Sequence, residues 1–142
     1  MRKLKVLIVD SLEPEAVGKE IKEILESLNI DCEIHSTHYY ELAIGRMEKE
    51  KELFDIISVC DFLGVILDDQ VSYFLKTAFG LNPETIIFFL SVELNTGYIR
   101  FFKDHGVNLI YEKNYNPSSK MINPRDTNSI KEAIIKTGVT SF

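Results

Sequence analysis

The sequence has no tryptophan, only two cysteines and no long apolar run. Cys32 and Cys60 are too few for the disulfide framework of a small secreted protein, so we expect a reducing, cytoplasmic setting. No apolar stretch approaches the roughly 20 residues that a membrane-spanning helix needs, which predicts no membrane insertion. The basic start at residues 1–5 leads into a short apolar stretch that ends at Asp10, so we expect a first strand there rather than a signal peptide.

Positive charge is also scarce. The chain has 16 Lys and Arg against 22 Asp and Glu, which gives a formal net charge of −6. Without a face rich in Lys and Arg, direct binding to nucleic acid is not expected. The length of 142 residues, of which 45% are apolar, instead fits one globular domain with a full core, spanning residues 1–142.

Short apolar runs alternate along the chain with segments in which apolar residues recur at helical spacing. This alternation predicts a parallel sheet with helices on both faces. Two prolines, Pro117 and Pro124, predict a long loop over residues 114–128. Strands are predicted at residues 4–9, 30–36, 85–90 and 107–111, and helices at residues 14–28, 39–52, from Asp68 or Asp69 to 78, from Asn95 or Thr96 towards Gly106, and 130–137.

The stretch from Leu53 to Asp69 allows two registers. In the first, residues 54–60 form the third strand and residues 62–67 are the loop after it. In the second, the preceding helix continues to Cys60 and residues 62–67 form the strand. Periodicity alone does not decide between a strand and a helix for such short apolar runs.

Polar residues follow the apolar runs where the predicted strands end: Asp10, Asp61, Ser91 and Lys113. Any one of them alone carries little weight, because loops are polar. The carboxyl ends of parallel strands meet at one edge of a sheet, which is where open α/β sheets place their sites. The four residues therefore predict a site with two carboxylates, a hydroxyl and an ammonium group.

This pattern resembles the receiver domain of bacterial response regulators, from Val6 to Gly138. Receivers carry acids after strand one, an acceptor Asp after strand three, a Ser or Thr after strand four and a Lys after strand five. The separations between Asp61, Ser91 and Lys113 are typical of that family. The resemblance implies an α/β, single-domain, flavodoxin-like (βα)5 three-layer sandwich with a five-stranded parallel sheet.

The resemblance also implies roles for these residues. Asp61 would be the phosphoacceptor, or Asp68 in the second register, and Ser91 and Lys113 would contact the phosphoryl group. Asp10 and Asp61 would hold Mg²⁺, with Glu13 as a further candidate ligand. The partner would be a sensor kinase or another signalling protein of a two-component system, and the chain would be a monomer or a weak homodimer. Enzymatic activity beyond self-phosphorylation from a phosphodonor and autodephosphorylation is not expected.

The chain also departs from the receiver pattern at several positions. The second acid after strand one is replaced, and so are the proline after the Lys and the aromatic residue of the last strand. Three of them, Ser11, Val65 and Ile110, favour a second hypothesis, a pseudo-receiver that binds its partner without being phosphorylated. The departures are Ser11, Val65, Asp69, Ile110 (beside Tyr111) and Asn114.

A third hypothesis depends on the second register. Residues 60–68 followed by a helix then look like nucleoside deoxyribosyltransferases and related TIR-like domains. Those enzymes cut glycosidic bonds with a Glu on that helix, and residues 70–79 contain no Glu. A small-molecule domain of that kind would therefore lack its catalytic carboxylate.

Overall fold

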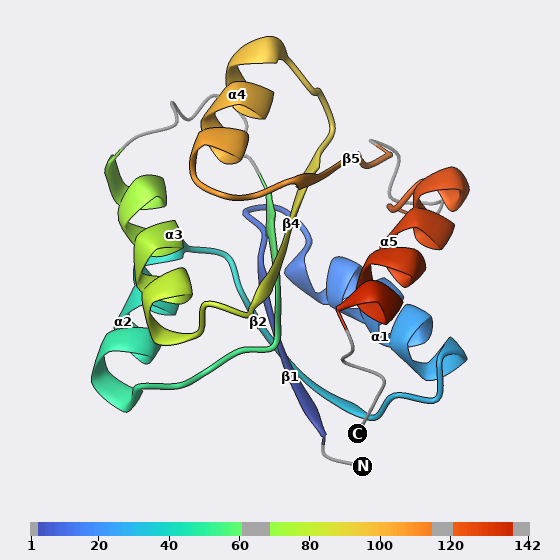
Figure 1. Cartoon of the computed structure of the whole chain (residues 1–142), viewed down its shortest axis with the longest axis horizontal. Coiled ribbons are helices and arrows are strands. Elements are labelled where there is room, and N and C mark those ends of the chain that lie inside the picture. Colours follow the sequence, from blue (N-terminus) through green and yellow to red (C-terminus); the bar gives the residue numbers. More distant parts are fainter. Residues whose placement is uncertain (1–2, 61–68, 115–120, 138–142) are drawn as a thin grey trace.

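Five strands and five helices alternate along the described chain, which covers residues 3–60, 69–114 and 121–137 of this computed structural model (Figure 1). The alternation confirms the predicted order of elements. The strands are β1 (Leu4–Val9), β2 (Cys32–Thr37), β3 (Ile56–Cys60), β4 (Ile86–Ser91) and β5 (Leu109–Glu112). The helices are α1 (Pro14–Ser27), α2 (Tyr40–Glu50), α3 (Asp69–Leu81), α4 (Thr96–Asp104) and α5 (Pro124–Lys136).

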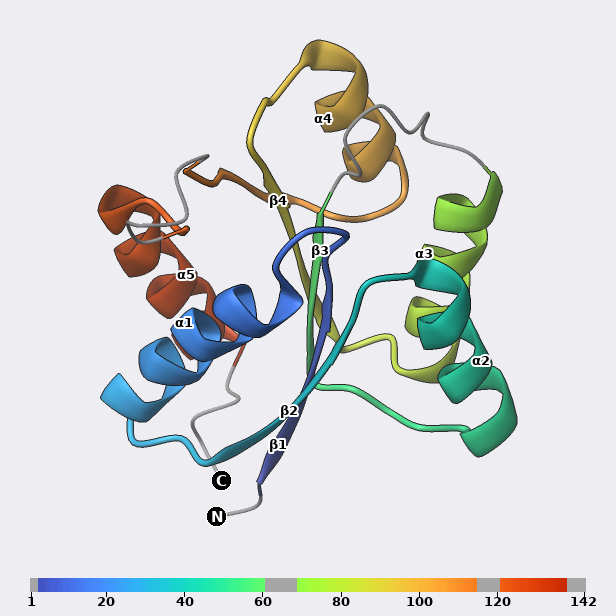
Figure 2. The same cartoon turned by 180° about the vertical axis from the view of Figure 1, so that it is seen from behind.

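All five strands pair in parallel, in the order β2-β1-β3-β4-β5. Helices α1 and α5 lie side by side on one face of the sheet, while α2, α3 and α4 lie on the other (Figures 1 and 2). This is the predicted flavodoxin-like, three-layer (βα)5 arrangement. Within the described ranges, none of the helices has the length and apolar character that a bilayer crossing requires.

The central strands are apolar because both faces of the sheet are covered. In β1, Leu4, Val6 and Ile8 pack into the core on the side of α1 and α5, whereas Leu7 and Val9 pack on the side of α2 and α3. All five residues of β3 and all six of β4 are buried. Alternate side chains point to opposite faces, so a strand buried on both sides becomes a continuous apolar run.

The first of the two registers for the third strand is correct. Helix α2 ends at Glu50, and Lys51 takes a left-handed conformation with φ of 51°, which terminates the helix. The chain then enters β3 at Ile56, so a helix that continues to Cys60 is wrong. The deoxyribosyltransferase-like hypothesis required that helix and loses its basis. Residues 62–67 lie outside the described part of the chain.

The predicted long loop over residues 114–128 is partly wrong. Helix α5 already begins at Pro124, because the fixed φ of proline suits the first position of a helix. Before it, Ile122 forms an isolated antiparallel bridge with Lys113. Pro124 therefore marks a helix start, whereas Pro117 lies outside the described residues.

The turn from α4 into β5 requires one left-handed residue. Asn95 caps the start of helix α4: its side chain accepts a hydrogen bond from the backbone N–H of Tyr98 at 2.9 Å. After the helix, Gly106 has φ of +87° and donates its N–H to the carbonyl of Lys103 at 3.0 Å. Both ends of this helix were predicted from the sequence. Glycine is suited to Gly106 because a side chain destabilises the left-handed conformation.

Two Gly→Ala variants should shift stability in opposite directions. Gly106→Ala should lower the free energy of unfolding by about 1–2 kcal/mol, because a β-carbon is unfavourable at this φ. A β-carbon there would meet the Phe79 ring at an ordinary distance of 3.6 Å, so the strain is in the backbone. Gly45→Ala should raise the free energy by about 0.5–1 kcal/mol, because this helical position has no heavy atom within 4 Å of an added β-carbon. Urea unfolding would measure both, and a loss at Gly45 would contradict the prediction.

Candidate functional site

A buried ion pair spans the edge of the sheet where the strands finish, from the end of β5 to the end of β1. The ammonium group of Lys113, which follows β5, donates to Asp10 Oδ2, which follows β1, at 2.5 Å. Asp10 is 1% exposed and Lys113 is 3% exposed. Because β3 and β4 lie between β1 and β5, the lysine side chain must cross the carboxyl ends of both strands. The structure thus brings together two of the predicted site residues.

The carboxylate of Asp10 is held on its other side by the backbone. Its Oδ1 accepts hydrogen bonds from the N–H groups of Leu12 at 2.9 Å and Glu13 at 3.0 Å. Burial by itself would raise the pKa of Asp10, but the neighbouring Lys113 ammonium and these hydrogen bonds outweigh it and lower the pKa below its usual range. Asp10 therefore stays ionised at neutral pH in spite of its burial.

Ser91, the last residue of β4, is fully buried at the same edge. Its hydroxyl donates to the carbonyl of Glu93 at 2.8 Å and accepts the N–H of Glu93 at 3.2 Å. Its own carbonyl accepts the backbone N–H of Lys113 at 2.8 Å. Ser91 and Lys113 are therefore adjacent through the backbone, while the Ser91 hydroxyl is engaged with the loop that follows it.

The proposed acceptor follows β3 directly, since Asp61 comes after Cys60. Both Asp61 and its alternative Asp68 lie outside the described residues. What precedes Asp61 is well fixed: the Tyr40 hydroxyl donates to the carbonyl of Cys60 at 2.9 Å, and the Tyr40 ring contacts Phe74 edge-on at 5.1 Å. The sequence placed Tyr40 among apolar helix residues, but its bond to β3 is a long-range contact that no local pattern predicts.

A metal ion would find few protein ligands among the described residues, which contain no group of three acidic, His or Cys side chains able to hold one. An ionised carboxylate offers about four acceptor directions, and Asp10 uses three of them for Leu12, Glu13 and Lys113. One direction on Oδ2 is left. Mg²⁺ typically uses one or two carboxylates and keeps several waters, so Asp10 with one further carboxylate fits its needs. Glu13 contributes its backbone N–H to Asp10, and its side chain is half-buried.

The backbone hydrogen bond of Asn114 explains why the proline of the receiver pattern is absent after Lys113. Receivers usually have proline there, which has no N–H, whereas the N–H of Asn114 donates to the carbonyl of Met121 at 2.6 Å. Together with the Lys113–Ile122 bridge, this bond pairs residues 121–122 antiparallel with residues 113–114, just beyond the end of β5. The Asn123 side chain also donates to the carbonyl of Glu112 at 2.9 Å. A residue other than proline is thus needed at position 114 for this antiparallel pairing.

The aromatic residue of β5 faces α5. The Tyr111 ring lies in the core on the side of α1 and α5, where it contacts Phe88 edge-on at 6.2 Å. Its hydroxyl is 3.2 Å from the hydroxyl of Ser129 on α5. Ile110, at the position of the receiver aromatic residue, packs on the opposite side of the sheet. The shift of one position therefore moves the aromatic ring from one face of the sheet to the other.

No protein-family model matches the sequence, and neither does any curated protein. Among solved structures, the chain is similar to a CheY-like response regulator receiver domain protein from Methanospirillum hungatei JF-1, with a TM-score of 0.65, 20% identity, and coverage of 97% of this chain and 98% of that one. It is similar to a putative pilus assembly-related protein from Burkholderia pseudomallei K96243, with a TM-score of 0.62, 12% identity, and coverage of 96% and 90%. It is also similar to the Mn²⁺-bound form of the response regulator Rcp1, with a TM-score of 0.59, 18% identity, and coverage of 92% and 91%. At these identities the similarity shows the fold alone, so the chain has the fold of CheY-like receiver domains, as predicted.

Removing one charge of the buried Asp10–Lys113 pair should lower the free energy of unfolding more than removing both charges. Lys113→Met leaves the Asp10 carboxylate buried without its counter-charge and should lower the free energy of unfolding by about 3 kcal/mol or more. The double variant Asp10→Asn/Lys113→Met has no uncompensated charge and should recover part of that loss. Urea unfolding at neutral pH would measure both. Arg125→Met, which breaks an ion pair that is 71% and 46% exposed, should change little.

The ion pair should also make stability depend on pH at the acid side. The pKa of Asp10 is lower in the folded chain than its unfolded value of about 3.9, so the unfolded chain binds more protons in acid. The stabilisation is complete above that value and is lost as the pH falls through the folded pKa. The advantage of the wild type over Asp10→Asn/Lys113→Met should therefore shrink as urea unfolding is repeated from about pH 6 to about pH 3. A constant difference across this range would contradict the assignment.

Proposed function

We propose that this chain is a receiver-type signalling module that accepts a phosphoryl group on Asp61 and binds a partner protein in response. The observation that supports this most is the buried Lys113–Asp10 pair, because the lysine side chain crosses the end of β3, and Asp61 follows that strand in the sequence. A buried ammonium group next to a nucleophilic carboxylate is suited to binding a phosphoryl group. The receiver-type fold agrees with this function.

The transfer is a displacement at phosphorus. A carboxylate oxygen of Asp61 attacks the phosphorus of an acyl phosphate or a phosphorylated kinase, and a new P–O bond forms as the bond to the leaving group breaks. The leaving group departs with the electron pair. Lys113 pairs with the negative charge on the phosphoryl oxygens. The Ser91 hydroxyl would donate to one of these oxygens in place of the Glu93 carbonyl that it binds in this structure.

A divalent cation fits the same arrangement. Asp10 and Asp61, with Glu13 as a further candidate, would hold Mg²⁺, which neutralises charge on the phosphoryl oxygens when it is bound. The similar response regulator Rcp1 is described in a Mn²⁺-bound form. The partner would be a sensor kinase or another signalling protein in the cytoplasm, with the chain as a monomer or a weak homodimer.

A second candidate is a pseudo-receiver that binds its partner without phosphorylation. Two observations favour it: Asp10 is followed by Ser11 instead of a second acid, and the Ser91 hydroxyl is already satisfied by Glu93. In this case the Asp10–Lys113 pair would serve stability alone. The experiment that follows separates the two candidates.

Incubation with acetyl phosphate and Mg²⁺ should add one phosphate to the wild type, stable in acid and labile in base, as measured by mass spectrometry of the intact protein. Asp61→Asn should abolish the adduct, because the amide cannot act as the nucleophile. Asp68→Asn is the matched control and should keep it. Lys113→Met should slow its formation strongly.

Two results would contradict phosphorylation on Asp61. An adduct that survives in Asp61→Asn but disappears in Asp68→Asn would move the acceptor to Asp68. A wild type that stays folded by circular dichroism but gains no phosphate would leave the pseudo-receiver as the better interpretation.

A further inference from the structure

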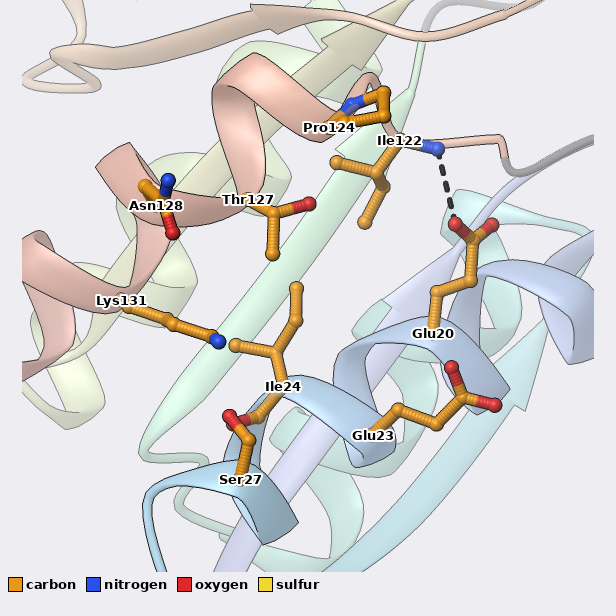
Figure 3. A pocket seen from close by; sticks show the side chains of 9 residues that line it. All are labelled: Glu20, Glu23, Ile24, Ser27, Ile122, Pro124, Thr127, Asn128 and Lys131. Atoms are coloured by element: carbon orange, nitrogen blue, oxygen red, sulfur yellow. Dashed lines mark hydrogen bonds between the residues drawn. The ribbon is translucent and has the colours of Figure 1, made fainter.

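The carboxylate of Glu20, on α1, binds two backbone N–H groups that lie 101 and 102 residues further along the chain. Its Oε2 accepts from Met121 at 2.8 Å and its Oε1 accepts from Ile122 at 3.1 Å. Figure 3 shows Glu20 reaching from α1 towards Ile122, which lies just before α5. Met121 and Ile122 are 5% and 1% exposed, so their backbone amides need partners inside the protein. Glu20 supplies both.

The segment that Glu20 holds is also the backbone partner of the site lysine. Ile122 forms an antiparallel bridge with Lys113, and the carbonyl of Met121 accepts the N–H of Asn114 at 2.6 Å. On its other side, Lys113 donates its own N–H to the carbonyl of Ser91 at 2.8 Å. The backbone of Lys113 thus lies between β4 and residues 121–122, and the second of these neighbours is fixed to α1 by one carboxylate.

Helix α1 therefore reaches Lys113 by two routes. The loop before α1 carries Asp10, which binds the ammonium group at the tip of the lysine. Within the helix, Glu20 binds the segment that supports the backbone of the lysine. One route fixes the end of the side chain, and the other fixes its base. When the ammonium group of Lys113 pairs with a phosphoryl group as well as with Asp10, the contact through Glu20 still holds the backbone of the lysine in place.

We propose that Glu20 is a positioning residue for Lys113 in phosphoryl transfer. This role rests on the proposed phosphorylation of Asp61. Glu20 acts through Met121, Ile122 and the backbone of Lys113, and the proposal gives it no contact with the phosphoryl group. A carboxylate is required because each of its two oxygens accepts one N–H. A glutamine at this position would offer one oxygen and would place an NH₂ group against the other N–H.

The test compares the rate of phosphorylation by acetyl phosphate in the wild type with that in Glu20→Gln and Glu20→Asp. Both variants should react more slowly by on the order of tenfold, because a displaced catalytic group loses much of its effect. Glu20→Asp keeps the charge but is one methylene shorter, so it separates position from charge. Glu26→Gln, which removes the same charge from an exposed position of α1, is the matched control and should react like the wild type.

A second readout does not depend on phosphorylation. Amide hydrogen exchange at Asn114, whose N–H binds Met121, should accelerate in Glu20→Gln while exchange in β1 and β3 stays as in the wild type. This pattern separates a local loss of support for Lys113 from general loosening of the fold, which would accelerate exchange throughout the sheet. Rates are compared well below the unfolding temperature of each variant.

The outcomes distinguish the two proposals. A wild type that gains no phosphate overturns the proposed function and the positioning role with it. A phosphorylated wild type whose rate is unchanged in both Glu20 variants overturns only the role of Glu20. A slower rate in Glu20→Gln but not in Glu20→Asp would also overturn it, because charge rather than position would then be the cause.

Discussion

The ion pair between Asp10 and Lys113 is the constraint around which the candidate site is arranged. Taking two charges out of water is costly, and their attraction compensates only if the geometry is good and the remaining polar atoms are satisfied. Both conditions are met here, since Asp10 also binds two backbone N–H groups and the Lys113 backbone is paired on both sides. The pair holds the ends of β1 and β5 at a fixed separation across the intervening β3 and β4.

The support for Lys113 differs from the arrangement that the receiver pattern implies. Asn114 stands where receivers usually have proline, and its N–H donates to the carbonyl of Met121. In β5 the aromatic residue is Tyr111, one position after the receiver position, which is occupied by Ile110. The ring therefore lies on the opposite face of the sheet from the one expected of a receiver, and it contacts α5. Both changes strengthen the connection of β5 with α5 and α1. Two of the departures, at Ile110 and Asn114, therefore have structural explanations in the described chain.

The sequence predicted the order of the elements well because the central strands are buried on both faces. Such strands form continuous apolar runs, as in residues 6–9 and 86–90. The same property made the register around Cys60 undecidable, since five consecutive buried residues show no period. Helix α5 starts earlier than the pattern of apolar residues predicts, because a proline such as Pro124 is typical of loops and equally of the first position of a helix.

The candidate site was predictable only in part, for a reason that lies in sequence separation. The strand-end positions of Asp10, Ser91 and Lys113 follow from local patterns and from the rule that parallel strands end at one edge. The groups that hold them do not. Tyr40 binds the carbonyl of Cys60 from 20 residues away, and Glu20 binds Met121 from 101 residues away.

Such contacts depend on how α1 and α2 pack against the sheet, which no local pattern specifies. Tyr40 belongs to an apolar stripe and Glu20 to the polar side of a helix, and each looks ordinary in its own segment. Their effect arises only when the sheet brings the ends of β3 and β5 within reach of helices on its opposite faces. In this fold, side chains at the strand ends supply the chemistry of the candidate site, and helical side chains fix the backbone that carries them.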